Sequence, residues 1–165
     1  MNITEGRVPS SIMANISGCA KDALKVLGKK YAKADPPTVV QAIDDFVYRW
    51  QRGDRPSEDV VEDGDTARLI MGSLWGEMLV EEFGWEWAKV TFHDHDDSVA
   101  FGVFSPDRSL AIYPLEFLLG CVQDPDVDAT VALSFNLLKA GKVPKMRKKS
   151  YTNVMDGVRR IVPRD

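Results

Sequence analysis

The residues best suited to chemistry lie in one short run, His93-Asp94-His95-Asp96-Asp97. Imidazole nitrogens and carboxylate oxygens are the ligands that zinc and related metals prefer. Two histidines separated by one residue point to the same side of an extended strand, so His93 and His95 are placed to share a metal ion. One of the three aspartates would then be a further ligand or a general base. This pattern predicts, as one alternative, a metal-assisted hydrolase.

The same run is also typical of a solvated turn. These are the only two histidines in the chain, and no third ligand position is specified elsewhere in the sequence. A polar turn between two strands uses residues of this kind without any metal. We therefore favour a solvated hairpin turn over a metal site, and we expect no cofactor.

A second concentration of carboxylates lies between Asp54 and Asp65, where the chain has six acidic residues and one arginine. Pro56 and Gly64 break regular structure, so the segment is predicted to be an exposed acidic loop. Acidic loops raise the association rate with a basic partner and help to select it, and the Asp54–Asp65 loop is the favoured contact. The predicted partner-binding residues of the two acidic segments are Asp54, Glu58, Asp59, Glu62, Asp63, Asp94, Asp96 and Asp97.

Other motifs that carry chemistry are missing from the sequence or misplaced in it. The segment Gly72-Ser73-Leu74-Trp75-Gly76 differs from the GxSxG nucleophile motif and lies within a predicted helix. There is no GxxxxGK[ST] loop and no GxGxxG motif after a strand, so nucleotide binding has no support. The sequence thus predicts no catalytic residues.

One basic segment stands out against the acidic remainder of the chain. Residues Lys142 to Lys149 include five basic side chains in eight positions, and their role is left open. The net charge of −4 and the pI near 5.2 argue against nucleic acid as a partner. A solvated or intramolecularly paired segment is the favoured interpretation.

Helices and strands must position these residues. Apolar residues recur with helical spacing over 11–31, 38–52, 67–79, 114–123 and 127–139. Short β-rich stretches at 85–92, 99–104 and 109–113 are separated by turn residues. Ser105-Pro106-Asp107-Arg108 suits a type I turn between the last two of these strands. The prediction is an α+β fold in which a short three-stranded antiparallel meander is flanked by N-terminal and C-terminal helices.

Two of the predicted helices carry further information. Gly72, Ser73 and Gly76 form a small-residue seam, and each glycine in a helix interior costs about 1 kcal/mol relative to alanine. The seam therefore predicts that a neighbouring element approaches this helix closely. The helix at 127–139 is apolar nearly all round, which predicts that it is central and buried. Core packing is likewise predicted for Trp85 and Trp87.

Length and composition favour one folded domain over residues 1–165. Hydrophobic residues make up 44% of the chain and charged residues 28%, which is ordinary for a globular protein. Cys19 and Cys121 have no ligand spacing and are expected to be buried, reduced thiols. The first residues have no apolar run of the signal-peptide kind, and no stretch reaches the roughly 18 apolar residues of a membrane span, so we expect a cytoplasmic protein.

A resemblance to a known class of proteins rests on two quoted stretches. Trp75-Gly76-Glu77 through Gly84-Trp85-Glu86-Trp87, and Phe104-Ser105-Pro106-Asp107-Arg108-Ser109 through Tyr113-Pro114, resemble small bacterial proteins with a helix, meander and helix core. Such proteins are similar in style to immunity proteins that sit beside polymorphic or contact-delivered toxins. The resemblance covers residues 66–140. It implies a protein-binding module that neutralises a cognate toxin and is not an enzyme.

Overall fold

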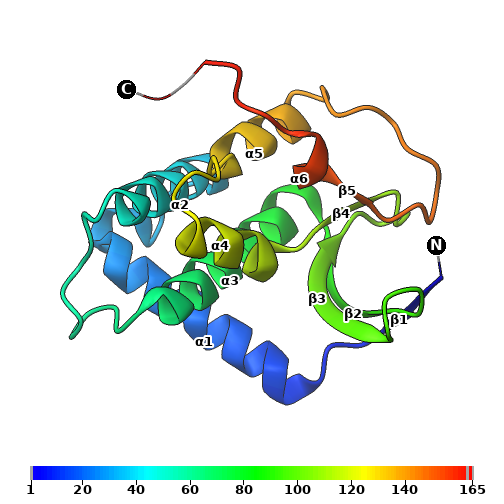
Figure 1. The fold of residues 1–165 in the computed structure, drawn as a ribbon, viewed down its shortest axis with the longest axis horizontal. Coiled ribbons are helices and arrows are strands. Elements are labelled where there is room, and N and C mark those ends of the chain that lie inside the picture. Colours follow the sequence, from blue (N-terminus) through cyan, green and yellow to red (C-terminus); the bar gives the residue numbers. More distant parts are fainter. Residues whose placement is uncertain (1, 163, 165) are drawn as a thin grey trace.

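A computed structural model describes residues 2–162 and residue 164 of the chain. It contains helices that precede and follow the strands of one sheet, which confirms the α+β class (Figure 1). In chain order the elements are β1 (Ile3–Gly6), α1 (Ser10–Leu27), the 3-10 helix η1 (Lys29–Tyr31), α2 (Pro36–Gln51), α3 (Gly64–Phe83), β2 (Glu86–Phe92), β3 (Ser98–Phe104), β4 (Leu110–Ile112), α4 (Pro114–Gln123), α5 (Val131–Lys139), β5 (Thr152–Asn153) and α6 (Val154–Gly157).

The sheet is larger than predicted. Its strand order is β1-β2-β3-β4-β5, with antiparallel pairing from β1 to β4 and parallel pairing of β5 with β4. The predicted meander corresponds to β2, β3 and β4, and its two turns fall where the turn residues indicated. The prediction of three strands was wrong because β1 and β5 have only four and two residues, too few to show alternation.

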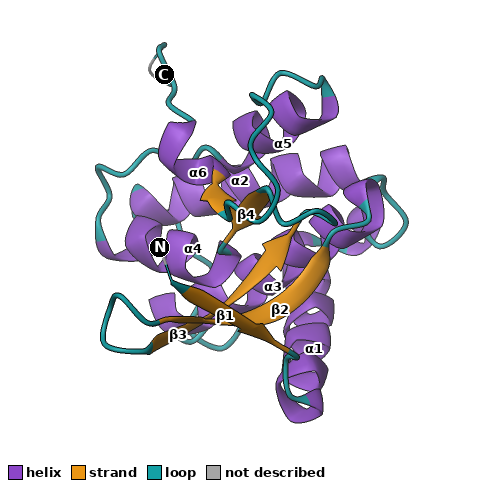
Figure 2. Ribbon diagram, turned by 90° about the vertical axis from the view of Figure 1, so that its right-hand side faces the viewer, coloured by secondary structure: helices purple, strands orange, loops and turns teal. Residues whose placement is uncertain are grey.

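Helix α3 is the centre of the protein. Its buried residues lie all round the helix, and α1, α2 and α4 pack against it together with strands β2 and β3. Figure 2 shows α3 running behind the strands with further helices stacked above them. Asp63 caps its N-terminus by accepting a hydrogen bond from the Thr66 N–H at 2.8 Å, and Gly84 ends it in a left-handed conformation with φ of 68°.

The two glycines of the α3 seam lie where neighbours approach most closely. A methyl group at Gly72 would lie 2.9 Å from Leu115 Cδ2 and 3.2 Å from backbone carbons of Pro114 and Leu115. A methyl group at Gly76 would lie 2.0 Å from Cζ2 of Trp87. The prediction of close packing along this seam is confirmed.

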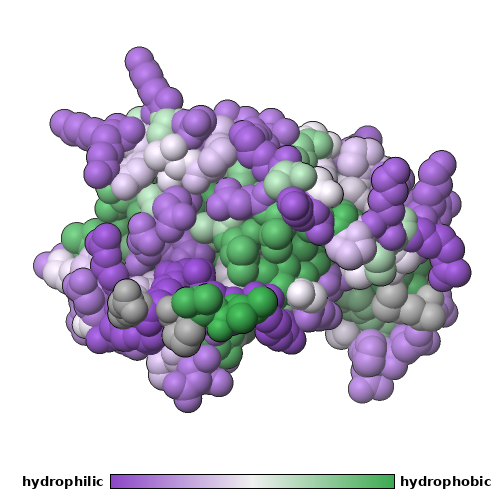
Figure 3. All heavy atoms as spheres, turned by 90° about the horizontal axis from the view of Figure 1, so that it is seen from above, coloured by the Kyte–Doolittle hydropathy of each residue, from purple (hydrophilic) through white to green (hydrophobic). Residues whose placement is uncertain are grey.

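Helix α5 differs from its prediction in position and burial. It begins at Val131 rather than at Val127, and Leu133, Leu137 and Leu138 remain partly exposed. The prediction that this helix is central was wrong, since α3 holds that place and α5 packs beside α2. From the side that carries α5 and α6, hydrophobic atoms are visible between polar side chains (Figure 3). The apolar composition of a helix was therefore not enough to predict which helix lies at the centre of the protein.

One buried charge joins α2 to α5 and to the end of the chain. Asp44 has no exposed surface and accepts a hydrogen bond from the Ala132 N–H at 2.8 Å. The Arg164 guanidinium forms an ion pair with it and donates to the Ala129 carbonyl at 2.9 Å. Burial raises the pKa of Asp44, while these hydrogen bonds and the positive charge of Arg164 oppose the rise.

The structure also bears on the cysteines and on membrane spans. Both thiols are unpaired; Cys121 is buried, whereas Cys19 is partly exposed, so the expected burial holds only for Cys121. Burial raises the pKa of Cys121 to about 12. No helix within the described residues is both long and apolar enough to cross a bilayer.

Candidate functional site

A groove of about 740 Å³ lies between the sheet, the start of α4 and the segment that carries β5 and α6. We call it the aromatic groove, because four of the side chains that line it are aromatic. Its aromatic residues are Phe92, Tyr113, Phe117 and Tyr151, and its charged residues are Glu116, Asp156 and Arg159. Mostly apolar walls with a few convergent polar groups are typical of a small-ligand site.

The rings of the groove rest on a small second core. Phe104 is fully buried there, with Ala88, Val90 and Ala111. The rings of Tyr113 and Tyr151 both contact Phe104 edge to face, with centroids at 5.8 and 5.6 Å. The two tyrosines therefore flank one buried ring, and their orientations are fixed by it.

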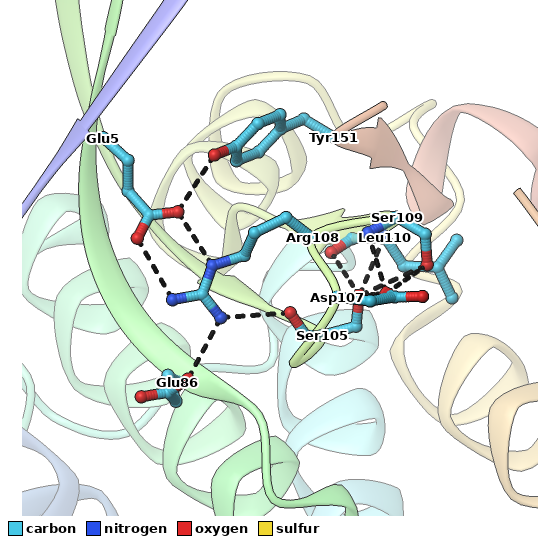
Figure 4. Close-up of polar contacts among 8 residues, drawn as sticks. All are labelled: Glu5, Glu86, Ser105, Asp107, Arg108, Ser109, Leu110 and Tyr151. Atoms are coloured by element: carbon cyan, nitrogen blue, oxygen red, sulfur yellow. Dashed lines mark hydrogen bonds and ion pairs between the residues drawn. The ribbon is translucent and has the colours of Figure 1, made fainter. Parts of the chain in front are cut away.

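Tyr151 is held by an ion-pair network that joins distant parts of the chain (Figure 4). Its hydroxyl donates to Glu5 Oε1 at 3.0 Å, and its N–H donates to the Arg108 carbonyl at 2.9 Å. Arg108 binds Glu5 through two hydrogen bonds of 2.8 and 3.1 Å, and Glu86 through a third of 3.1 Å. The Arg108 hydrogen bond is the main cause that lowers the pKa of Glu5. This network holds Tyr151 in the left-handed backbone region, at φ of 49°, which costs free energy for a residue other than glycine.

The hairpin turn beside this network is closed by Asp107. Its Oδ1 accepts hydrogen bonds from the Ser109 N–H at 3.0 Å, the Ser109 hydroxyl at 2.7 Å and the Ser105 hydroxyl at 3.1 Å (Figure 4). The carbonyl of Asp107 accepts the N–H of Lys149 at 3.1 Å. The basic segment 142–149 therefore ends against this turn, with its basic side chains exposed to solvent.

The two carboxylates of the groove have no side-chain partner in the described structure. Within the described chain, neither Glu116 nor Asp156 forms an ion pair or a hydrogen bond with another side chain, whereas Arg159 Nη1 lies 3.4 and 3.2 Å from the carbonyls of Met155 and Val158. Loss of water to surrounding protein raises the pKa of Glu116, although the residue stays accessible from the groove. Burial, with smaller contributions from nearby acidic groups, raises the pKa of Tyr113 to about 12.

Gly102 of β3 lets Tyr113 approach the sheet, and its replacement gives a test of the groove. A methyl group at Gly102 would lie 2.8 and 2.9 Å from carbons of the Tyr113 ring and 2.9 Å from Phe104 Cζ. Since carbon atoms essentially never pack this closely, Gly102→Ala should displace the ring and lower the free energy of unfolding by about 1 to 2 kcal/mol. Chemical denaturation and near-ultraviolet circular dichroism measure the two effects. The control is Gly6→Ala in β1, where nothing lies within 4 Å; equal behaviour of the two variants would contradict this prediction.

The turn at His93 to Asp97 connects β2 with β3 and contacts strand β1. His93 Nε2 lies 2.6 Å from Thr4 Oγ1, and His93 Nδ1 lies 2.6 Å from Asp97 Oδ1. The order hydroxyl, imidazole, carboxylate is that of a nucleophilic relay, but these residues are exposed and do not line the aromatic groove. Asp96 and Asp97 have φ of 55° and 53°, as a tight turn requires. The prediction of a solvated hairpin turn is confirmed.

The metal-site alternative receives no geometric support from this turn. Both ring nitrogens of His93 face Thr4 and Asp97 rather than His95. Across the described residues, no three His, Cys, Asp or Glu side chains are grouped so that they could hold a metal ion. The predicted pair His93 and His95 therefore lacks the third ligand that such a site needs.

The acidic loop between α2 and α3 is exposed and anchored at both ends. Two of its carboxylates serve the fold, since Asp63 caps α3 and Asp65 pairs with Arg68 at 2.9 Å. Val61 is only 1% exposed and fixes the loop to the core. The carboxylates with no ion pair or side-chain hydrogen bond in the described structure are Asp54, Glu58, Asp59 and Glu62.

The two acidic segments lie at opposite ends of the molecule (Figure 1). The loop between α2 and α3 is at the left end of the long axis, and the turn at 93–97 lies beside the start of β1 at the right end. The Asn2 N–H also donates to Asp94 at 2.8 Å, which ties this turn to the N-terminal strand. The predicted partner-binding residues therefore form two separate surfaces, which the sequence left open.

Sequence reasoning did not identify the aromatic groove. Phe92, Tyr113 and Tyr151 are far apart in the chain and belong to no recognised motif. The available signal was that both faces of the predicted strand at 85–92 are partly apolar, which indicated that other elements cover this strand on both sides. It did not indicate which residues would provide that cover.

Comparisons with protein-family models, with curated proteins and with solved structures find no match to this chain. They lend no support to the resemblance to immunity proteins, which stays a prediction.

Proposed function

We propose that this protein is a stoichiometric binding module, of the immunity type, that neutralises a basic toxin by holding it against the acidic loop between α2 and α3. The observation that carries the proposal is the set of four exposed carboxylates that have no partner within the described structure. Charges of one sign on an exposed loop attract a partner of opposite charge and raise the association rate.

Contacts with the body of the protein anchor the loop, which favours binding. Arg55 donates from Nε to the Trp50 carbonyl at 3.1 Å, and its guanidinium lies 4.6 Å from the centre of the Trp50 ring. Val61 is inserted into the core, while its neighbour Val60 is 57% exposed among the carboxylates. A fixed loop loses less conformational entropy when a partner binds, and an apolar side chain inside a charged surface adds contact area.

Charge reversal in the loop tests the proposal. Changing Glu58, Asp59 and Glu62 to lysine should lower the association rate with the partner by about tenfold or more at low salt, because steering depends on the charge of the loop. The dissociation rate should change less, and the fold should stay intact since these exposed side chains form no ion pair or hydrogen bond with other described residues. Surface plasmon resonance with a partner obtained by co-purification from the native host measures both rates.

A matched pair of variants separates the loop from overall charge. Glu58→Lys/Glu62→Lys and Glu81→Lys/Asp126→Lys change the net charge equally. The second pair lies outside the loop, at exposed positions whose side chains form no ion pair or hydrogen bond with other described residues. Equal association rates for the two double variants would refute the assignment of the loop. Neutralisation is tested separately, by measuring the toxicity of the bound partner. If the bound partner keeps its full toxicity, the protein is a binding module but not an immunity protein.

A further inference from the structure

We propose that the aromatic groove is a second binding site, independent of the acidic loop, for an alkylguanidinium group. The ligand is either a free small molecule that carries this group or an arginine side chain of a peptide. The two sources share the chemistry that the groove recognises.

The shape of the groove suits a ligand in which an alkyl chain carries a guanidinium group. Its volume of about 740 Å³ lies within the range of small-ligand sites. Ala100 and Met155 add apolar surface beside the four rings, which can cover the alkyl part of the ligand. The rings themselves offer faces on which a cation can lie.

The charge of the groove favours a cation. In the part of the chain that the structure describes, neither Glu116 nor Asp156 has an ion pair or a side-chain hydrogen bond, so a ligand does not have to displace one. Among the described residues that line the groove, the one cation is Arg159, whose Nη1 faces two backbone carbonyls. Two carboxylates and one guanidinium line the groove, so its lining carries an excess of negative charge, although Arg68 outside the groove also acts on Glu116.

A guanidinium fits this combination of groups better than an ammonium. It is planar, stacks on aromatic faces and donates two parallel hydrogen bonds to a carboxylate. The protein already uses such pairs internally, since Arg52 and Arg164 lie 4.4 and 4.7 Å from the centre of the Tyr48 ring. The groove offers the same kind of aromatic ring, together with two carboxylates that form no ion pair in the described structure.

The groove is also organised before any ligand arrives. Tyr151 is fixed by Glu5 and by the Arg108 carbonyl, and Tyr113 is fixed between Gly102 and Phe104. Rings that are already in place lose little freedom on binding. The left-handed backbone of Tyr151 is the kind of strain that is retained where a side chain must be held in position.

Titration with butylguanidinium, followed by NMR and by calorimetry, tests the proposal. The control ligand is butylurea, which has the same shape and no charge. A peptide arm compares acetyl-Gly-Arg-Gly-amide with its citrulline counterpart. We expect the two guanidinium ligands to shift the resonances of Tyr113 and Tyr151, and the two neutral ligands to bind at least tenfold more weakly. Binding of butylguanidinium supports a free small molecule as ligand, and binding of the peptide alone supports an arginine side chain.

Variants locate the binding to the groove. Glu116→Gln and Asp156→Asn should each weaken butylguanidinium binding by about tenfold, since each removes one charge-assisted hydrogen bond. The matched variants Glu81→Gln and Asp126→Asn, which lie outside the groove, should leave binding unchanged. Near-ultraviolet circular dichroism confirms that each variant keeps the tyrosine packing.

Three results would overturn the proposal. The first is equal binding of the neutral and the charged ligands, and the second is binding that the two groove variants leave unchanged. The third is that no guanidinium ligand binds the folded protein at 10 mM, a concentration about ten times a millimolar dissociation constant. None of these results bears on the acidic loop, whose charge reversal should leave guanidinium binding as it is.

Discussion

Replacing Gly76 by alanine should lower the free energy of unfolding by about 3 kcal/mol, although alanine is the better helix former. The methyl group would lie 2.0, 2.6 and 2.9 Å from three carbons of the Trp87 indole. The gain in helix propensity is about 1 kcal/mol, and it is outweighed by the displacement of a large ring packed between α3 and β2. A loss of this size is a large part of the 5 to 15 kcal/mol that holds a typical domain folded. Urea denaturation followed by tryptophan fluorescence measures it.

Other helical glycines provide matched controls. Gly18 in α1 has nothing within 4 Å of an added methyl group, so Gly18→Ala should raise stability by up to about 1 kcal/mol. Gly72→Ala should be destabilising, since backbone atoms at 3.2 Å cannot move aside as a flexible side chain can. If Gly76→Ala proved as stable as Gly18→Ala, the close packing of Trp87 on α3 would be wrong.

The Arg164→Ala variant should be destabilised by about 3 kcal/mol at neutral pH. It removes the ion-pair partner of the Asp44 carboxylate, which has no exposed surface in the native structure, and leaves the Ala132 N–H as its hydrogen-bond donor among the described residues. Removing one partner of a buried ion pair typically costs 3 to 5 kcal/mol, and the lower end applies because the arginine side chain is 17% exposed. Thermal and urea denaturation at pH 7 measure the loss.

The pH dependence of this variant gives a second test. Burial raises the pKa of Asp44, and loss of the positive charge should raise it further. Between the ordinary pKa of 3.8 and this raised value, the folded state binds more protons than the unfolded state, so stability falls as the pH rises through that range. Arg164→Ala should therefore recover much of its lost stability, relative to the unchanged protein, as the pH is lowered towards 4.

A double variant isolates the buried charge. Asp44→Asn/Arg164→Ala keeps an oxygen that accepts the Ala132 N–H but has no carboxylate to titrate. It should lose less stability than Arg164→Ala at pH 7, and the difference between the two should shrink at low pH. A difference that does not depend on pH would contradict the role assigned to Asp44.

Local chemistry was enough to predict several elements of the fold. The helix predicted over 114–123 begins at Pro114 as α4 does, since first-turn prolines act within a few residues. The turns at 93–97 and 105–108 followed from their polar and proline residues. Predictions of this kind depend only on neighbours in the sequence.

Features that depend on distant contacts were not predictable in this way. Strands β1 and β5 exist because the sheet offers them edges with unpaired backbone groups, not because their own sequences favour strands. Helix α5 has the composition of a central helix, yet α3 takes that place because Gly72 and Gly76 admit neighbours on sides where side chains would exclude them. The exposure of the acidic loop followed from its composition, but its separation from the turn at 93–97 required the whole fold.

The contact between Glu5 and Tyr151 has a consequence for how the protein is made. These residues are 146 positions apart, so β1 is synthesised long before Tyr151 is available to donate its hydrogen bond to the Glu5 carboxylate. Helices α1 to α5 and strands β2 to β4 are all synthesised in the interval. A polypeptide cut before Ser150 would leave Phe104 uncovered on the Tyr151 side, and would offer chaperones and proteases an apolar surface that marks it as incomplete.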